Sequence, residues 1–373
     1  MYDQIREDTL YIMFYAVVTA MAMMASCYLL FRRGNAFAKD VTPPRRLRRW
    51  TAAFFAAIAL CHLWYLPTYF LTSSDDKMLG GLIAALLDSM TIIPLAIVVF
   101  LAMLQDRRRP LWPIALTVAP LIAGLAWCIA TSSYALLSVL YVYYLLMWLG
   151  LIINMVRALR QYGRWLRNNY ADLEHKEVWQ NFVVLAIILL VYAIYSLDAG
   201  ETIYEYAMEL INIVFICYLL WRVETLSDLS IAVSNAEEET DAIENVEDND
   251  YPLSIRNNIG PLLKKHCEDS QLYLQYDISI SQLATLIGVN RSYLSQHFSS
   301  LGTTYNAYIN GLRIQHFIYL YHEAVALHQP ISVQQLAYQS GFRSYSTFYA
   351  AFKQSMGMTA TEWMRKQDGV GTE

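Results

Sequence analysis

Two short segments near the C-terminus are rich in hydroxyl, amide and guanidinium side chains. The first contains Asn290, Arg291, Ser292, Ser295 and Gln296, and the second contains Arg343, Ser344, Tyr345, Ser346, Thr347, Tyr349 and Lys353. Groups of these kinds form hydrogen bonds with base edges and phosphates in the major groove of DNA. If these side chains lie on exposed helix faces, the two segments predict non-covalent binding of double-stranded DNA.

The residues ahead of each segment predict a helix followed by a tight turn. Ile280, Leu283, Ala284 and Gly288 recur as Val333, Leu336, Ala337 and Gly341, at an offset of 53 residues. The i, i+3, i+4 spacing is typical of a helix with one buried face, and an alanine lets a second helix cross closely. Glycine supplies the left-handed backbone of the turn. Asn290 and Ser344 are suitable N-caps for the helices that follow. We therefore predict two helix-turn-helix units, each with a second, recognition helix.

The stretch from Tyr305 to His328 predicts one long helix between the two units. Such a helix could hold the units at a fixed separation. Two recognition helices about 34 Å apart would enter successive major grooves on one face of the duplex.

This region resembles the DNA-binding domain of the AraC/XylS family of bacterial transcription regulators. The resemblance rests on the run from Gly341 to Phe348, on Phe352-Lys353, on the run from Met356 to Thr359, and on Arg313-Ile314 in the linking helix. It covers about 110 residues. The whole chain also resembles the membrane-bound, seven-span members of that family found in Bacteroidetes. The resemblance implies promoter binding by both units.

Charge leaves a second interpretation of this region open. From residue 252 to the end, nine Lys or Arg stand against seven Asp or Glu, whereas many nucleic-acid binders are clearly basic. Binding would then be weak without a homodimer or a high local concentration. The alternative is that the two units form a packing module for another protein.

The first two thirds of the chain predict a polytopic membrane domain. Over the whole chain, 56% of residues are apolar, 16% are charged and the mean hydropathy is +0.30. Seven stretches are long and apolar enough to span a bilayer. They run from Thr9 to Phe31, Trp50 to Leu71, Met78 to Leu104, Leu111 to Ala130, Tyr134 to Met155, Trp179 to Leu197 and Thr202 to Trp221. The predicted fold class is all-α, a seven-span bundle plus a cytosolic tandem helix-turn-helix domain.

The loop charges predict the orientation of this bundle. Fifteen Lys and Arg residues follow the first, third and fifth spans, whereas the opposite face has only Arg6 and Lys77. Basic loops stay on the cytoplasmic side. We therefore expect an inner-membrane protein with its N-terminus outside and its C-terminal domain in the cytoplasm, where DNA lies.

An acidic segment separates the two predicted domains. Residues 236–250 contain eight acidic side chains and no Lys or Arg. Such a segment cannot bury enough apolar surface to order itself. We predict a transmembrane domain over residues 1–222, a flexible linker over 223–253 and a DNA-binding domain over 254–368. The linker is either a plain tether or a nucleic-acid mimic that covers the DNA-binding face.

Four ionisable residues fall within predicted spans, where charge is costly and often functional. They are His62, Asp88, Glu205 and Glu209. Glu205 and Glu209 are one turn apart and share a helix face. Together the four could line a sensor pocket for a cationic ligand or a proton. The alternative is a polar cluster that only holds helices together.

Cysteine and histidine spacing gives no support for an enzyme or a metal site. Cys27, Cys61, Cys128 and Cys217 lie in apolar spans and Cys267 stands apart, without a CxxC pair. His316, His322 and His328 do not share one helix face, and no phosphate loop or nucleophile elbow is present. We therefore expect no catalytic residue, no metal and no cofactor.

Taken together, these features predict a one-component regulator that responds to an unidentified small-molecule or membrane signal. Its expected partners are promoter DNA and the lipid bilayer, with a homodimer as one arrangement. The alternative is a transporter-like or receptor membrane protein whose cytosolic helical module binds another protein.

Overall fold

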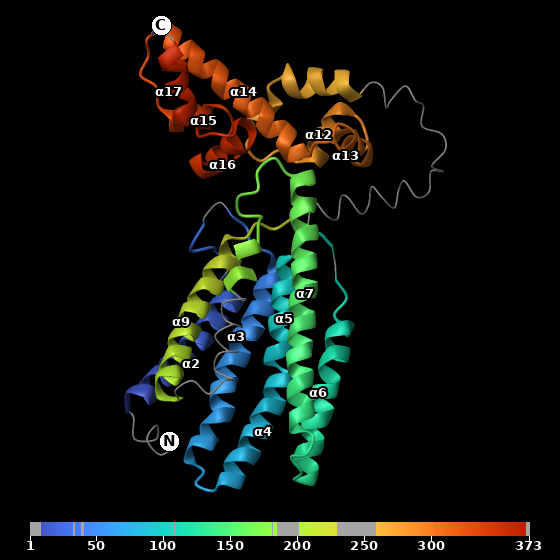
Figure 1. Cartoon of the computed structure of the whole chain (residues 1–373), viewed down its shortest axis with the longest axis vertical. Coiled ribbons are helices and arrows are strands. Elements are labelled where there is room, and N and C mark those ends of the chain that lie inside the picture. The colour runs from blue at the N-terminus through green and yellow to red at the C-terminus, as the bar shows by residue number, and fades with distance from the viewer. Residues whose placement is uncertain are drawn as a thin grey trace, which may run out of the picture. The chain divides into compact units, whose positions relative to one another are not determined.

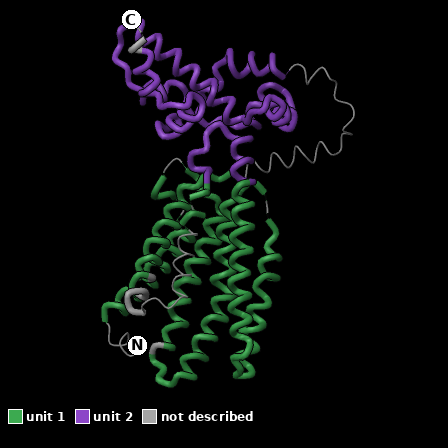
Figure 2. Tube along the Cα trace, in the orientation of Figure 1, with its two compact units in different colours: residues 1–160, 178–230 green, residues 161–177, 231–373 purple. Residues whose placement is uncertain are grey.

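The computed structural model describes residues 9–32, 34–38, 41–107, 109–180, 182–184, 201–229 and 259–370. Within these ranges the regular structure is helical, and β-pairing is limited to one isolated bridge between Tyr170 and Ser279. The chain divides into two compact units, shown in Figure 2. Unit 1 comprises residues 1–160 and 178–230, and unit 2 comprises residues 161–177 and 231–373.

Unit 1 is a bundle of long apolar helices (Figure 1). Its helices are α2 (Thr9–Phe31), α3 (Arg45–Tyr65) with the 3₁₀ turn η1 (Leu66–Phe70), α4 (Ser74–Met90), α5 (Ile92–Met103), α6 (Trp112–Thr131), most of α7 (Leu137–Asn169) and α9 (Glu201–Thr225). Helix α2 packs against α3 and α9, α3 against α5, and α4 against α6. Five candidate membrane spans lie within the described residues, and the sixth predicted span lies mostly outside them.

The third predicted span is broken near its middle. Helix α4 ends at Met90 and α5 begins at Ile92, with Thr91 in a non-helical conformation between them. Pro94 cannot donate a backbone hydrogen bond to Met90, so the helical ladder is interrupted here. The two helices together still form one apolar stretch of 30 residues.

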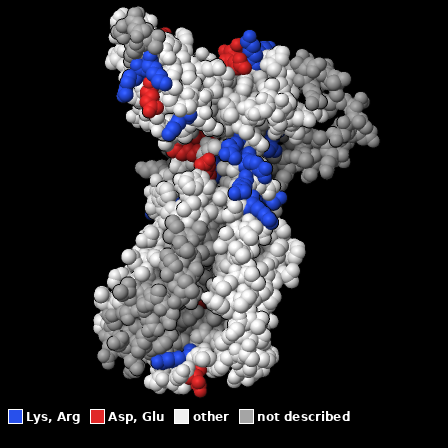
Figure 3. All heavy atoms as spheres, viewed as in Figure 1, with Lys and Arg blue, Asp and Glu red and all other residues white. Residues whose placement is uncertain are grey.

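Helix α7 is longer than a membrane span requires. Its 33 residues extend about 50 Å, whereas the hydrocarbon core of a bilayer is about 30 Å thick. Lys and Arg side chains gather over its C-terminal end (Figure 3). From Gln161 onward its last turns belong to unit 2.

Helix α9 reaches beyond the predicted end of the seventh span. It ends at Thr225, and Glu224 near its end is fully buried beside Arg48, with 3.0 Å between Arg48 Nε and Glu224 Oε1. Leu229, beyond the end of α9, is also buried. The acidic run 236–250 of the predicted linker lies outside the described residues.

Unit 2 contains two hydrophobic clusters joined by one helix. Its labelled elements are the π-helical turn η2 (Lys264–Glu268), the 3₁₀ turn η3 (Leu272–Leu274), α12 (Ile280–Ile287), α13 (Arg291–Ser300), α14 (Tyr305–Ala326), α15 (Val333–Gln339), α16 (Tyr345–Met356) and α17 (Ala360–Val370). The first turns of α14 bury Tyr305 and Ile309 in the first cluster, and its later turns bury Phe317 and Tyr321 in the second. Helix α14 is therefore shared by both cores, as the predicted linking helix requires.

Candidate nucleic-acid interface

The first helix pair is α12 and α13. The Ser279 hydroxyl accepts from the backbone N–H of Gln282, and the Gln282 side chain accepts from the backbone N–H of Ser279 at 2.8 Å. This reciprocal capping box fixes where α12 begins. Helix α12 ends at Gly288, whose φ of +71° confirms the predicted left-handed turn.

Helix α13 begins at the predicted N-cap. The side-chain oxygen of Asn290 accepts from the backbone N–H of Ser292 at 2.7 Å. Leu294 and Phe298 are buried in the first cluster. Because these two residues face the core, the opposite side of α13 faces outward.

The second helix pair, α15 and α16, repeats this construction. Ser332 caps α15, Gly341 has a φ of +85°, and the Ser344 hydroxyl accepts from the backbone N–H of Thr347 at 3.3 Å. Phe348 and Phe352 are fully buried in the second cluster. Both predicted N-caps and both predicted turns are therefore confirmed.

None of the twelve predicted DNA-contacting residues is buried. Ser292, Gln296, Tyr345, Ser346, Tyr349 and Lys353 are exposed, and Asn290, Arg291, Ser295, Arg343, Ser344 and Thr347 are half-buried. Asn290 and Ser344 already use their side-chain oxygens as caps. The exposed side chains place donors and acceptors suited to base edges and phosphates on both helices.

Comparison with known protein families agrees with this geometry. A family model described as a helix-turn-helix domain matches residues 283–366. The match supports an AraC-type DNA-binding domain in this part of the chain, and it indicates a DNA-binding regulator, a class that is generally not enzymatic. No curated protein and no solved structure among those compared matches the chain.

One buried arginine of the helix-turn-helix domain has a role that the sequence pattern did not reveal. Arg313 of α14 is 1% exposed. Its guanidinium donates to the carbonyls of Tyr273 (2.8 Å), Gln275 (2.8 Å) and Tyr276 (3.3 Å), in the segment that precedes α12. Its charged carbon also lies 5.6 Å from the centre of the Phe342 ring, in the turn of the second pair. Arg313 therefore links the segment that precedes α12 to the turn of the second helix pair.

The same segment supports a predicted DNA-contacting side chain. The ring of Tyr276 lies against the guanidinium of Arg343, with 5.6 Å between the ring centre and the charged carbon. Burial lowers the pKa of Arg313 to about 10, so its guanidinium stays charged at neutral pH and keeps its carbonyl partners. Tyr276 thus contacts both the buried Arg313 and the half-buried Arg343.

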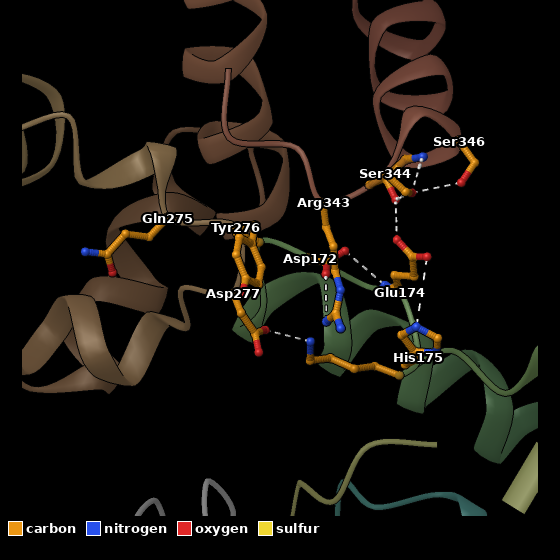
Figure 4. Close-up of polar contacts among 12 residues, drawn as sticks. Asp172, Glu174, His175, Gln275, Tyr276, Asp277, Arg343, Ser344 and Ser346 are labelled. Carbon is orange, nitrogen blue, oxygen red and sulfur yellow. Dashed lines mark hydrogen bonds and ion pairs between the residues drawn. The ribbon is translucent and has the colours of Figure 1, made fainter. Parts of the chain in front are cut away.

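Three predicted DNA-contacting side chains bind residues 169–174 of the same unit. Arg291 Nε donates to Asn169 (3.0 Å), Arg343 pairs with Asp172 (3.8 Å) and Thr347 donates to Glu174 (3.4 Å). Figure 4 shows Asp172 and Glu174 pointing toward Arg343 and the start of α16. The sequence gave no indication of these contacts, because residues 169–174 follow a predicted span more than 100 positions earlier in the chain.

Three of the predicted sensor residues contact side chains of other helices in unit 1. His62 Nε2 of α3 lies 3.4 Å from Glu209 Oε2 of α9, and both side chains are nearly buried. Asp88 of α4 instead accepts from Trp64 Nε1 (3.1 Å) and Tyr65 Oη (3.0 Å), both near the end of α3. The side chain of Glu205 lies outside the described part of the chain.

Among the described residues, no group of three or more His, Cys, Asp or Glu side chains is placed to hold a metal ion.

Proposed function

We propose that this chain is a membrane-anchored transcription regulator that binds specific promoter DNA with two recognition helices, α13 and α16. The observation that carries the proposal is the repeat of one capped helix-turn-helix geometry around a shared helix, in a chain with five apolar candidate spans. A DNA-binding domain that is attached to a membrane domain can connect events at the membrane to transcription.

The placement in the membrane is part of the proposal. Seven spans, with the N-terminus outside and the C-terminus inside, put the basic ends of the first, third and fifth spans on the cytoplasmic side of the inner membrane. The same arrangement puts the helix-turn-helix domain, residues 254–368, beside the DNA. The acidic run 236–250 serves as the tether, and a homodimer would strengthen weak binding through two linked contacts.

The DNA-reading role predicts a specific loss when two arginines are removed. The full chain is tagged in its native membrane, and the bound DNA is recovered across the genome. Wild-type protein is expected to enrich discrete promoters, and Arg291→Ala with Arg343→Ala is expected to reduce that enrichment about 100-fold, because each arginine supplies roughly 1–3 kcal/mol of contact energy.

A matched control separates this effect from a general loss of positive charge. Lys264→Ala with Lys265→Ala removes the same charge from exposed positions outside α13 and α16, and it should leave the promoter set unchanged. Enrichment that survives the arginine changes, or the absence of any enriched promoter for wild-type protein, would contradict the proposal.

The sensing role is assigned to the buried contact between His62 and Glu209, with Asp88 beside the end of α3. These groups connect α3 to α9 and to α4, and α9 is the last described helix of unit 1. A ligand or a proton that alters one contact would change how these helices pack. Such coupling requires two states of the bundle with different affinity for the signal.

Neutral substitutions at these positions should change transcriptional output. Glu209→Gln and Asp88→Asn, each tested with a reporter fused to a recovered promoter, are expected to shift its output at least about fivefold, the lower end of ordinary coupling energies. Asp75→Asn with Asp76→Asn changes exposed carboxylates at the start of α4 and should leave output unchanged. Unchanged output for Glu209→Gln and Asp88→Asn would leave these residues as structural contacts.

A further inference from the structure

Residues 169–176, the docking segment, are built into the first helix-turn-helix core. Ala171 is fully buried in its hydrophobic cluster. The backbone N–H of Ala171 donates to the carbonyl of Ile278 at 3.2 Å. The side-chain amide of Asn306 donates to the carbonyls of Tyr170 (3.2 Å) and Ala171 (2.6 Å). The segment is therefore held by several contacts that do not involve the recognition helices.

From this position the docking segment offers acceptors to both recognition helices. It supplies an amide oxygen to Arg291 and carboxylates to Arg343 and Thr347. Carboxylate and phosphate oxygens are both anionic acceptors for guanidinium and hydroxyl donors. A phosphate and these carboxylates would compete for the same donors, and a carboxylate left beside a bound phosphate would repel it.

The carboxylate of Asp172 is only partly compensated in the docked position. The residue is 2% exposed, and among the described residues its Oδ2 accepts no hydrogen bond. Burial raises the pKa of Asp172, although Lys176 and Arg343 partly oppose that rise. A desolvated carboxylate with one distant ion pair stabilises a contact weakly. The contact between Asp172 and Arg343 can therefore break without a large loss of stability.

We propose that the docking segment is an internal competitor of DNA, which must leave Arg291, Arg343 and Thr347 before both recognition helices can bind a duplex. This inference rests on the proposed function, since it assigns a regulatory state to the same DNA-binding surface. Helix α7 continues directly into the segment at Asn169, so a movement of α7 reaches the segment along the chain.

The first test removes the two competing charges. Full-length protein in lipid nanodiscs is titrated with a pool of random-sequence duplexes of about 30 base pairs, long enough for two successive major grooves. The Asp172→Asn, Glu174→Gln variant is expected to bind the duplex about tenfold more tightly than wild type. A gain of this size follows if the DNA-binding surface is free in about one wild-type molecule in ten and in every molecule of the variant. Asn keeps the oxygen that accepts from the backbone N–H of Glu174 at 3.1 Å.

A second variant loosens the segment without changing any charge. Asn306→Ala removes two hydrogen bonds to the segment and touches no predicted DNA-contacting side chain, and it should also tighten DNA binding. Asp269→Asn with Glu323→Gln is the charge control, because it removes two exposed carboxylates elsewhere in unit 2 and should bind like wild type.

Hydrogen exchange of the backbone amide of Ala171 reports docking directly. We expect protection in wild-type protein without DNA and faster exchange once the duplex is bound. The inference is overturned if Ala171 exchanges freely without DNA, if it stays protected with DNA bound, or if neither variant tightens binding. In each of those cases wild-type protein still binds DNA and the proposed function stands. Absence of DNA binding in all four proteins would overturn both.

Discussion

Replacing Arg313 with alanine is expected to lower the stability of the helix-turn-helix domain by at least about 3 kcal/mol, because a buried guanidinium is removed and three backbone carbonyls lose a charged donor. The guanidinium binds the carbonyls of Tyr273, Gln275 and Tyr276 and lies against the ring of Phe342. No nearby side chain on α14 has the same planar set of donors. The segment before α12 and the turn of the second helix pair would therefore lose a contact that links them.

Hydrogen exchange of α15 and α16 in the full chain, held in lipid nanodiscs, measures this loss as a fall in the free energy of opening. Arg313→Lys should recover only part of it, since one ammonium group cannot reproduce a planar fork of donors. Arg365→Ala removes an exposed arginine and should change nothing. Equal protection in Arg313→Ala and Arg365→Ala would show that the buried bonds do not hold the domain together.

Replacing Gly341 with alanine is expected to lower the stability of the domain more than the same change at Gly288. Both glycines have a positive φ, which costs an alanine roughly 1–2 kcal/mol. A Cβ at Gly341 would also lie 2.7 Å from the Cα and from the carbonyl oxygen of Leu274, whereas no atom lies within 4 Å of a Cβ at Gly288. Backbone atoms cannot rotate away from the new Cβ as a flexible side chain can. We therefore expect Gly341→Ala to lower the stability of the domain by about 3 kcal/mol or more in total.

The pair of substitutions forms its own control. The same exchange measurement on Gly288→Ala gives the cost of the backbone conformation alone, and the excess at Gly341 gives the cost of separating the second turn from Leu274. Losses of equal size would mean that the close approach is unimportant. DNA binding should fall with Gly341→Ala, because the turn leads directly into Arg343.

Local features of the domain could be predicted because their causes are local. Asn290 and Ser344 cap the helices that follow them, since a side-chain oxygen needs only the next two or three backbone N–H groups. Gly288 and Gly341 have the left-handed backbone that their spacing predicted. Candidate membrane spans could be recognised because a bilayer demands long apolar helices, and five such helices lie within the described residues. Seven spans and their orientation remain predictions.

Contacts between distant parts of the chain could not be predicted in this way. Arg313 belongs to the motif that resembles the AraC/XylS family. The backbone carbonyls that bind its guanidinium lie about 40 residues earlier, and no side-chain pattern there indicates the contact. The sequence also grouped His62, Asp88, Glu205 and Glu209 as one candidate sensor pocket, which stays a prediction, and it did not indicate their individual partners. In the structure, His62 contacts Glu209, and Asp88 accepts hydrogen bonds from Trp64 and Tyr65.

By itself, the sequence determined the helices, their caps and turns, the apolar stretches and the doubled DNA-binding pattern, because each depends on the order of neighbouring residues. Tertiary structure alone decided which groups contact the side chains that were predicted to bind DNA. Asp172 and Glu174 lie beside Arg343 and Thr347 because α7 continues past its apolar stretch and Ala171 is buried in the first core. Burial of this kind depends on how the surfaces of unit 2 fit together, which no local pattern encodes.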